Sequence, residues 1–194
     1  MAKIQMEIGQ GPPILLTLNP VALVGSIVEG RPDFVTVAAI GAAASNPPAL
    51  ATALQPHRYS LQGIRQNMVF SVNIPSVNLL RETDYCGIVS GAKRDKVKDC
   101  SFRVFYGKSD KAPLIKQCPV NHVCEVIEIL NLTSHMFVIG KIVETFVSNE
   151  CLTEGRPDVS KVRPFLFGSR KYLACGDFVG EPFKIGLDIK PSAT

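Results

Sequence analysis

The residues best suited to chemistry in this sequence are a cation and a hydroxyl at the start of an expected helix. Arg58 can pair with two oxygens of a phosphate group, and Ser60 can donate its hydroxyl to a third. A helix that begins at Ser60 also offers free backbone amides and the positive end of its dipole. The segment therefore predicts a phosphate site. The residues alone equally fit a plainer interpretation, in which Ser60 only caps the helix and Arg58 is solvated.

Several other kinds of catalytic or nucleotide-binding site are not supported by the sequence. No G-x-G-x-x-G opens a helix after a strand, and Gly87–Lys93 has the wrong spacing for a Walker A loop. The three histidines, His57, His122 and His135, lie in different segments, and no Ser or Cys stands in a nucleophile elbow. A Rossmann dehydrogenase, a P-loop NTPase and a hydrolase are therefore not indicated.

The six cysteines do not form a disulfide or zinc pattern, because no C-x-x-C pair is present. Cys118, His122 and Cys124 are the only cluster of possible metal ligands, and their spacing is not that of a zinc knuckle. We therefore expect reduced thiols and no metal. Cys86 is interpreted as a small residue that packs within a helix, with redox action as the alternative.

The composition is that of one ordinary domain spanning residues 1–194. A chain of this length, with 46% hydrophobic and 20% charged residues, can bury one sizeable core. Its net charge of +4 is too mild and too scattered to indicate a nucleic-acid surface.

Two segments bear on location. Met1–Leu16 lacks the basic start and continuous apolar run of a secretory signal. Phe34–Pro56 is uncharged, but Asn46–Pro48 interrupts its middle, which favours two buried strands over a membrane span. We therefore expect a cytoplasmic protein that binds no membrane.

The elements that must position these residues are mostly strands. Turn chemistry separates several of them, at Glu29–Asp33 and at Asn131–His135. The expected strands are Val21–Ile27, Phe34–Ile40, Ala49–Leu54, Val69–Ile74, Val120–Leu130, Met136–Val147 and Tyr172–Phe178.

We expect two helices, one of about two turns from Ser60 and one from Val77 or Asn78 to Ile88. Ala92–Asp99 is expected to be a surface loop or a short helical turn, and Gly155–Lys161 a turn-rich excursion. Short strands, few helices and no βαβ rhythm predict a mainly β fold, a closed antiparallel, Greek-key-like barrel with a few short helices.

The segment Asn46–Lys96 resembles the flavin reductase-like family, and its flavoredoxin-type members in particular. The resemblance extends from about Val21 to about Val179, and it implies an FMN-binding split β-barrel. The motifs that carry it are Asn46–Pro48, Pro56–Ser60, Phe70–Pro75, Asp84–Gly87, Ser90–Gly91 and Asp95–Lys96.

The resemblance also implies a set of cofactor-binding residues. Lys96 would offset the phosphate charge or the charge of the reduced flavin, although a lone lysine in such a segment is usually a surface residue. His135 would contact the flavin or simply end a turn, and Phe167 would be an aromatic contact or a core residue. The full set is Thr36, Ala38, Ala39, Arg58, Ser60, Lys96, His135 and Phe167, with Ile40 as a further candidate for backbone contact.

Two residues depart from the family's pattern. Asp33 stands where members tend to have Asn, and Ala39 stands where they have an aromatic residue. A carboxylate near the phosphate would repel it, and a missing aromatic wall would shield the ring less, each at a cost of about 1 kcal/mol or more.

The activity implied by the resemblance is that of an NAD(P)H-dependent flavin reductase. A nicotinamide donor would pass hydride to FMN, and the reduced flavin would pass electrons to a small-molecule or protein acceptor, with no covalent nucleophile on the protein. The family also implies a homodimer with its flavin sites near the subunit interface. Two alternatives remain: a flavoredoxin-like electron carrier without NAD(P)H activity of its own, and a barrel that has lost its flavin.

Overall fold

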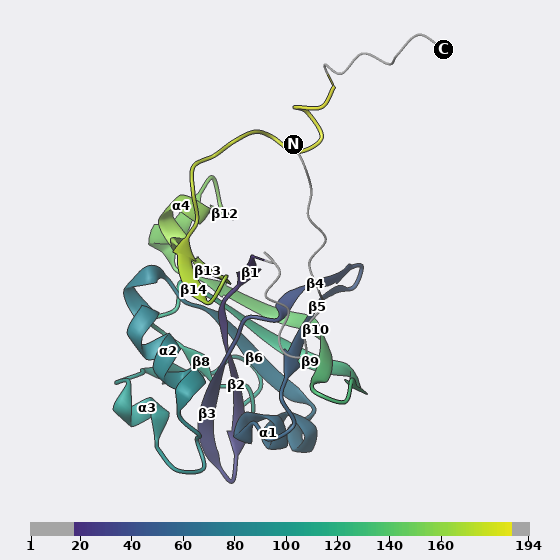
Figure 1. Cartoon of the computed structure of the whole chain (residues 1–194), viewed down its shortest axis with the longest axis vertical. Helices are drawn as coiled ribbons and strands as arrows, with labels where there is room; N and C mark the ends of the chain where they lie inside the picture. The colour runs from purple at the N-terminus through teal and green to yellow at the C-terminus, as the bar shows by residue number, and fades with distance from the viewer. Residues whose placement is uncertain (1–17, 188–194) are drawn as a thin grey trace.

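The protein is described from a computed structural model that covers residues 18–187, so the expectation made for Met1–Leu16 lies outside the described residues. Figure 1 shows a curved sheet with short helices around it, and a C-terminal segment that extends away from the body. The strands are β1 (Asn19–Pro20), β2 (Ala22–Val28), β3 (Arg31–Val37), β4 (Ile40–Ser45), β5 (Pro48–Leu54), β6 (Val69–Ile74), β7 (Val104–Phe105), β8 (Leu114–Ile115), β9 (Val120–Asn131), β10 (Met136–Val147), β11 (Leu152–Thr153), β12 (Arg156–Pro157), β13 (Phe165–Gly168) and β14 (Lys171–Ala174). The helices are α1 (Tyr59–Asn67), α2 (Leu80–Ile88), α3 (Lys96–Asp99) and α4 (Val159–Val162), with 3₁₀ turns η1 (Val77–Leu79) and η2 (Asn149–Cys151).

The main sheet has seven antiparallel strands in the order β3-β2-β6-β9-β10-β5-β4. Its two edge strands, β3 and β4, are consecutive in the chain and are joined only by Ala38 and Ala39. The sheet must therefore curl until its edges approach, and the Ala53 amide of β5 donates at 2.8 Å to the carbonyl of Ala39 in the connection between the edge strands. The expected mainly β, antiparallel barrel is confirmed.

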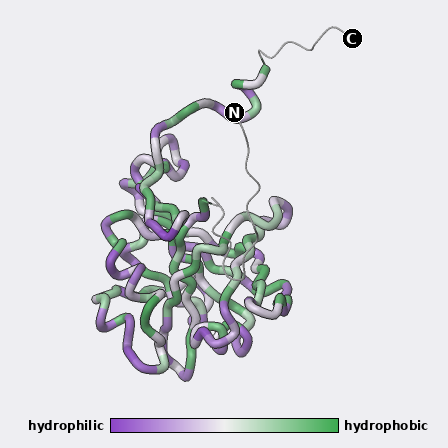
Figure 2. Tube along the Cα trace, in the orientation of Figure 1, coloured by the Kyte–Doolittle hydropathy of each residue, from purple (hydrophilic) through white to green (hydrophobic). Residues whose placement is uncertain are grey.

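The core fills the inside of this curled sheet. Every residue of β2 is buried, and the main apolar cluster joins side chains such as Val24, Phe70 and Val138 to Leu61 and Ile64 of α1. Figure 2 shows hydrophobic residues along these central strands and hydrophilic residues on many of the outer turns. At Gly140, an added Cβ would lie 2.6 Å from the Phe70 ring, so this ring packs directly on the β10 backbone.

The first hairpin differs from the expected one. Its turn contains only Glu29 and Gly30, both with positive φ, which is the geometry that joins two twisted strands most tightly. Arg31–Asp33, expected in the turn, therefore belongs to β3, which ends at Val37 rather than at Ile40. Pro32 is tolerated because β3 is an edge strand, where a missing amide breaks no ladder.

Other corrections concern short strands. β4, which follows Ala39, was not expected as a strand of its own, because its small, mostly exposed residues have no apolar alternation. β13 was missed as well, and β14 ends at Ala174 rather than at Phe178. The expectations for β6, β9 and β10 and for the helical segment that ends at Ile88 are confirmed. Within residues 18–187, no helix is long and apolar enough to cross a membrane.

Candidate functional site

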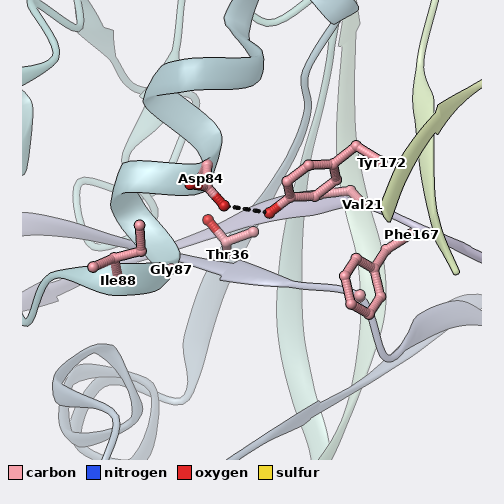
Figure 3. A pocket seen from close by; sticks show the side chains of 8 residues that line it. Val21, Thr36, Asp84, Gly87, Ile88, Phe167 and Tyr172 are labelled. Carbon is pink, nitrogen blue, oxygen red and sulfur yellow. Dashed lines mark hydrogen bonds between the residues drawn. The ribbon is translucent and has the colours of Figure 1, made fainter. Parts of the chain in front are cut away.

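A cleft of about 290 Å³ opens between β3, the C-terminal end of α2 and the β13–β14 hairpin, at the lower end of the range for ligand pockets. Figure 3 shows the side chains around it. Three of the residues predicted from the sequence, Thr36, Ala38 and Phe167, line this cleft. Its full lining is Val21, Thr36, Ala38, Asp84, Gly87, Ile88, Phe167 and Tyr172.

Five residues of this lining were not predicted as site residues, and two of them, Asp84 and Tyr172, contact each other. The Tyr172 hydroxyl donates to Asp84 Oδ1 at 2.8 Å, which ties the β13–β14 hairpin to α2. Burial and this hydrogen bond raise the pKa of Tyr172 to about 12, so the hydroxyl remains a donor at neutral pH. Asp84 is the first residue of the motif Asp84–Gly87, and this motif was the only feature of the sequence that pointed to either residue.

An aromatic wall closes one side of the cleft. The rings of Phe167 and Tyr172 lie 5.8 Å apart at 62°, and the ring of Phe165 packs edge-on against Tyr172 from the core. β13 is held in place at its start, where the Val21 amide donates to the Phe165 carbonyl at 3.3 Å. The hairpin thus presents Phe167 to the cleft on a backbone fixed to β2.

On the opposite side of the cleft, a glycine brings α2 close to β3. At Gly87, an added Cβ would lie 3.3 Å from Thr36 Cβ, so α2 approaches β3 closely at this point. The Thr36 hydroxyl donates to the Thr83 carbonyl of the same helix. Arg58 Nη1 donates to the Gly87 carbonyl at 2.8 Å, which places the guanidinium beside the cleft. Because Arg58 is only half-buried, its other N–H groups remain open to a ligand.

The start of α1 differs from the expectation for Ser60. The N-cap residue is Arg58, and no side chain caps the helix. Ser60 lies inside the first turn and is fully buried, and its hydroxyl donates to Asp33 Oδ2 instead. The prediction that Ser60 caps this helix was wrong, because α1 begins at Tyr59, one residue earlier, and the Ser60 hydroxyl faces the Asp33 carboxylate on β3.

Lys96 is also turned toward Asp33. Its Nζ lies 3.2 Å from Asp33 Oδ1, and the two side chains are only 3% and 6% exposed. Lys96 Nζ also donates to the Phe34 carbonyl and, at 3.4 Å, to the Cys86 carbonyl. The segment Ala92–Asp99, expected to be a surface loop or a short helical turn, contains the short helix α3 and carries a buried lysine. The charge of Asp33 is compensated within the protein. Neither Lys96 nor Ser60 lines the cleft, and their contact with a flavin remains a prediction.

The remaining predicted residues lie outside the cleft. The Ala39 carbonyl accepts the bond from Ala53 that joins the β3–β4 connection to β5. His135 ends the turn between β9 and β10, where its Nδ1 lies 3.0 Å from Ser134 Oγ and its carbonyl accepts from the Leu132 amide. Figure 1 places this turn well away from α2. The flavin contact of His135 therefore stays untested.

The chemistry of the residues fits one kind of ligand best. Val21, Ala38 and Ile88 provide apolar surface, and Phe167 provides an aromatic edge, as a flat ring requires. Arg58 and the amides at the start of α1 provide the donors that a phosphate requires. Within residues 18–187, no group of three or more His, Cys, Asp or Glu side chains could hold a metal.

A family model gives the first comparison with known proteins. The model of the flavin reductase like domain matches residues 16–175, a range that includes every residue of the cleft. The resemblance noted in segment Asn46–Lys96 is therefore confirmed over most of the chain.

Solved structures give the second comparison with known proteins. A flavoredoxin from Methanosarcina acetivorans is 33% identical, with a TM-score of 0.89, and the match covers 95% of this chain and 98% of that one. A flavoredoxin from Desulfovibrio vulgaris (Miyazaki F) is 31% identical, with a TM-score of 0.84, over 93% of this chain and 100% of that one. An FMN-binding protein from Thermus thermophilus, 19% identical, has a TM-score of 0.79 over 94% and 100% of the two chains, and this likeness concerns the fold alone.

Proposed function

We propose that this chain, which belongs to the flavin reductase-like domain family, binds FMN in the cleft and transfers electrons through it. The observation that carries the proposal is the position of Arg58, whose guanidinium is bonded to the backbone of a residue that lines the cleft. This contact puts a fixed positive charge next to a cavity with an aromatic wall, which suits a ring that carries a phosphate.

The residues have distinct roles in this proposal. Arg58 and the first turn of α1 bind the phosphate, and Phe167 with Ile88 covers the ring and excludes water. The bond from Tyr172 to Asp84 holds the hairpin against α2 and so fixes the width of the cleft. FMN, when bound, supplies the hydride and electron chemistry itself.

We further propose that the electron donor is NADH or NADPH and that the acceptor is a small molecule or another protein. A homodimer with the cleft near its interface is part of the same proposal. It offers a role for His135, which lies away from the cleft of its own chain and would reach the flavin of a second copy.

A second candidate is a flavoredoxin-like electron carrier that holds FMN but has no NAD(P)H activity of its own. The observation that favours it is the similarity to two flavoredoxins at more than 30% identity over nearly the whole chain. Stopped-flow mixing of the FMN-loaded protein with NADH or NADPH separates the two. Rapid bleaching of the flavin absorption supports the reductase, whereas bleaching only by a reduced partner protein supports the carrier.

The test of the proposal as a whole is the visible absorption spectrum after loading with FMN and passage through a sizing column. Flavin bands that elute with the protein, at the volume of a dimer, are the expected result. An Arg58→Ala variant should retain less flavin. A colourless wild-type protein that also shows no change in flavin fluorescence on titration would contradict FMN binding and favour a barrel that has lost its cofactor.

A further inference from the structure

Two cysteines are brought together where α2 meets the end of α3, next to the cleft but not in its lining. Cys86 lies on α2, one residue before Gly87, and is fully buried. Cys100 directly follows α3 and is half-exposed. Figure 1 shows α2 and α3 as neighbours on one side of the barrel, and both cysteines belong to the same apolar cluster.

Several contacts fix this arrangement. Cys100 Sγ lies 4.0 Å from the carbonyl of Glu82, which is one helical turn before Cys86. Because a helical side chain leans toward the preceding turn, the Cys86 thiol points to the same place. The Tyr85 hydroxyl donates to Asp99 Oδ2 at 2.7 Å, so the residues just before both cysteines are also in contact.

The two thiols are chemically unequal. Interaction with Cys100, together with burial, raises the pKa of Cys86, and interaction with Cys86 lowers the pKa of Cys100. The positive charge of Lys96 also lowers the pKa of Cys100, although burial and the carboxylates of Glu82 and Asp99 oppose it. A partly exposed thiol that ionises first, next to a buried thiol, is the arrangement of a reactive cysteine with a resolving partner.

We propose that Cys86 and Cys100 are a redox modification site that forms an intrachain disulfide on oxidation by hydrogen peroxide. The Cys100 thiolate attacks one peroxide oxygen and the O–O bond breaks, which leaves a sulfenic acid on Cys100 and releases one water after protonation. The Cys86 sulfur then attacks the Cys100 sulfur, its proton leaves with the hydroxyl, and a second water is released. In balance, two thiols lose two electrons and two protons, and one peroxide becomes two waters.

The site does not depend on the proposed FMN binding, so the test uses the chain without added flavin. The protein is treated with equimolar peroxide, its free thiols are blocked under denaturing conditions, and the tryptic peptides are mapped by mass spectrometry. We expect the peptides 82–93 and 99–103 to be joined, with two of the six thiols lost and both restored by dithiothreitol. A chain whose six thiols all stay free under excess peroxide would overturn the proposal, as would a disulfide that joins other cysteines.

Single variants test whether Cys86 and Cys100 are the two cysteines that react. Cys100→Ser should prevent the loss of thiols, while Cys86→Ala should leave Cys100 to oxidise to sulfenic or sulfinic acid without a crosslink. Cys175→Ser, which removes another half-exposed thiol outside the pair, should form the 82–93 to 99–103 crosslink like the wild type. If Cys86→Ala fails to fold, the loss of thiols in Cys100→Ser compared with that in Cys175→Ser is sufficient to test the proposal. Equal loss of thiols in those two variants would rule the pair out.

Discussion

At the scale of single residues, Asp33 changes the role of two neighbours that the sequence had assigned to a ligand. Its carboxylate binds both Ser60 and Lys96 in a place closed to water. Gly91 packs on the same carboxylate so closely that an added Cβ would lie 2.0 Å from Asp33 Oδ1. The repulsion expected from Asp33 is therefore compensated inside the protein, and the cluster connects β3, α1 and the start of α3 behind the cleft.

The buried ion pair gives a prediction on stability. Asp33→Asn should destabilise the fold by about 3 kcal/mol, because it leaves the ammonium of Lys96 buried without a counter-charge. Adding Lys96→Met to this variant should restore most of the loss, since both charges are then absent. Urea unfolding of the two single variants and the double variant measures the coupling. As a control, Asp110→Asn removes an exposed pair with Lys111 and should change little.

A second prediction separates ligand binding from folding at the start of α1. Arg58→Ala should weaken FMN binding about tenfold, as expected for the loss of one charge-assisted contact, with a small change in stability. Ser60→Ala should instead lower the free energy of unfolding, because Asp33 loses a buried donor. Fluorescence titration with FMN and urea unfolding test the pair, with Arg65→Ala on the exposed face of α1 as control. Unchanged FMN affinity in Arg58→Ala would remove the proposed phosphate site.

Which single residues could be predicted from the sequence depended on whether their partners lie nearby in the chain. Arg58, Thr36 and Phe167 were found because their types and family positions suffice to suggest the cleft. The burial of Lys96 was not predicted, because the Asp33 carboxylate that compensates its charge lies in a distant part of the sequence. Tyr172 was missed for the same reason: its partner, Asp84, lies on a different element.

At the scale of elements, α1 is positioned by a glycine that faces β2. A Cβ added at Gly63 would lie 2.3 Å from the Ile27 carbonyl and 2.8 Å from Ser26 Oγ. Gly63→Ala should therefore destabilise the protein by about 1–3 kcal/mol, despite the better helix propensity of alanine, because the obstacle is backbone. Gly41→Ala in β4 has no heavy atom within 4 Å and is the matched control. Urea unfolding compares them, and equal midpoints would contradict this packing.

The elements that were predicted well are those whose own sequence decides them. β9 and β10 are long, and β6 alternates along its length, so their apolar pattern is sufficient. β4 has no apolar alternation and β13 has only four residues. Each is defined by the strands it pairs with, β4 by β5, and β13 by β14 and β1. A pairing partner cannot be read from local pattern, which is why the edges of the fold were the least predictable part.

At the scale of the whole molecule, the barrel is closed by contacts between segments far apart in the chain, and His122 lies in the middle of them. It is on β9, opposite Val72 of β6 and Thr145 of β10. Its Nδ1 lies 2.9 Å from Thr145 Oγ1, and burial lowers its pKa below the ordinary value of 6.5. The unfolded chain therefore binds a proton at a higher pH than the folded barrel does.

This difference fixes the sign of a pH effect on the stability of the barrel. The contribution of neutral His122 is fully present above about pH 6.5, and it is lost as the pH falls from there toward the folded pKa, because protons then favour the unfolded chain. His122→Gln should flatten the acid limb of stability against pH in that window, whereas exposed His57→Gln should leave it unchanged. Urea midpoints between pH 7.5 and pH 5, measured for both variants, check this. An acid limb as steep in His122→Gln as in the wild type would show that the loss of stability arises from other groups.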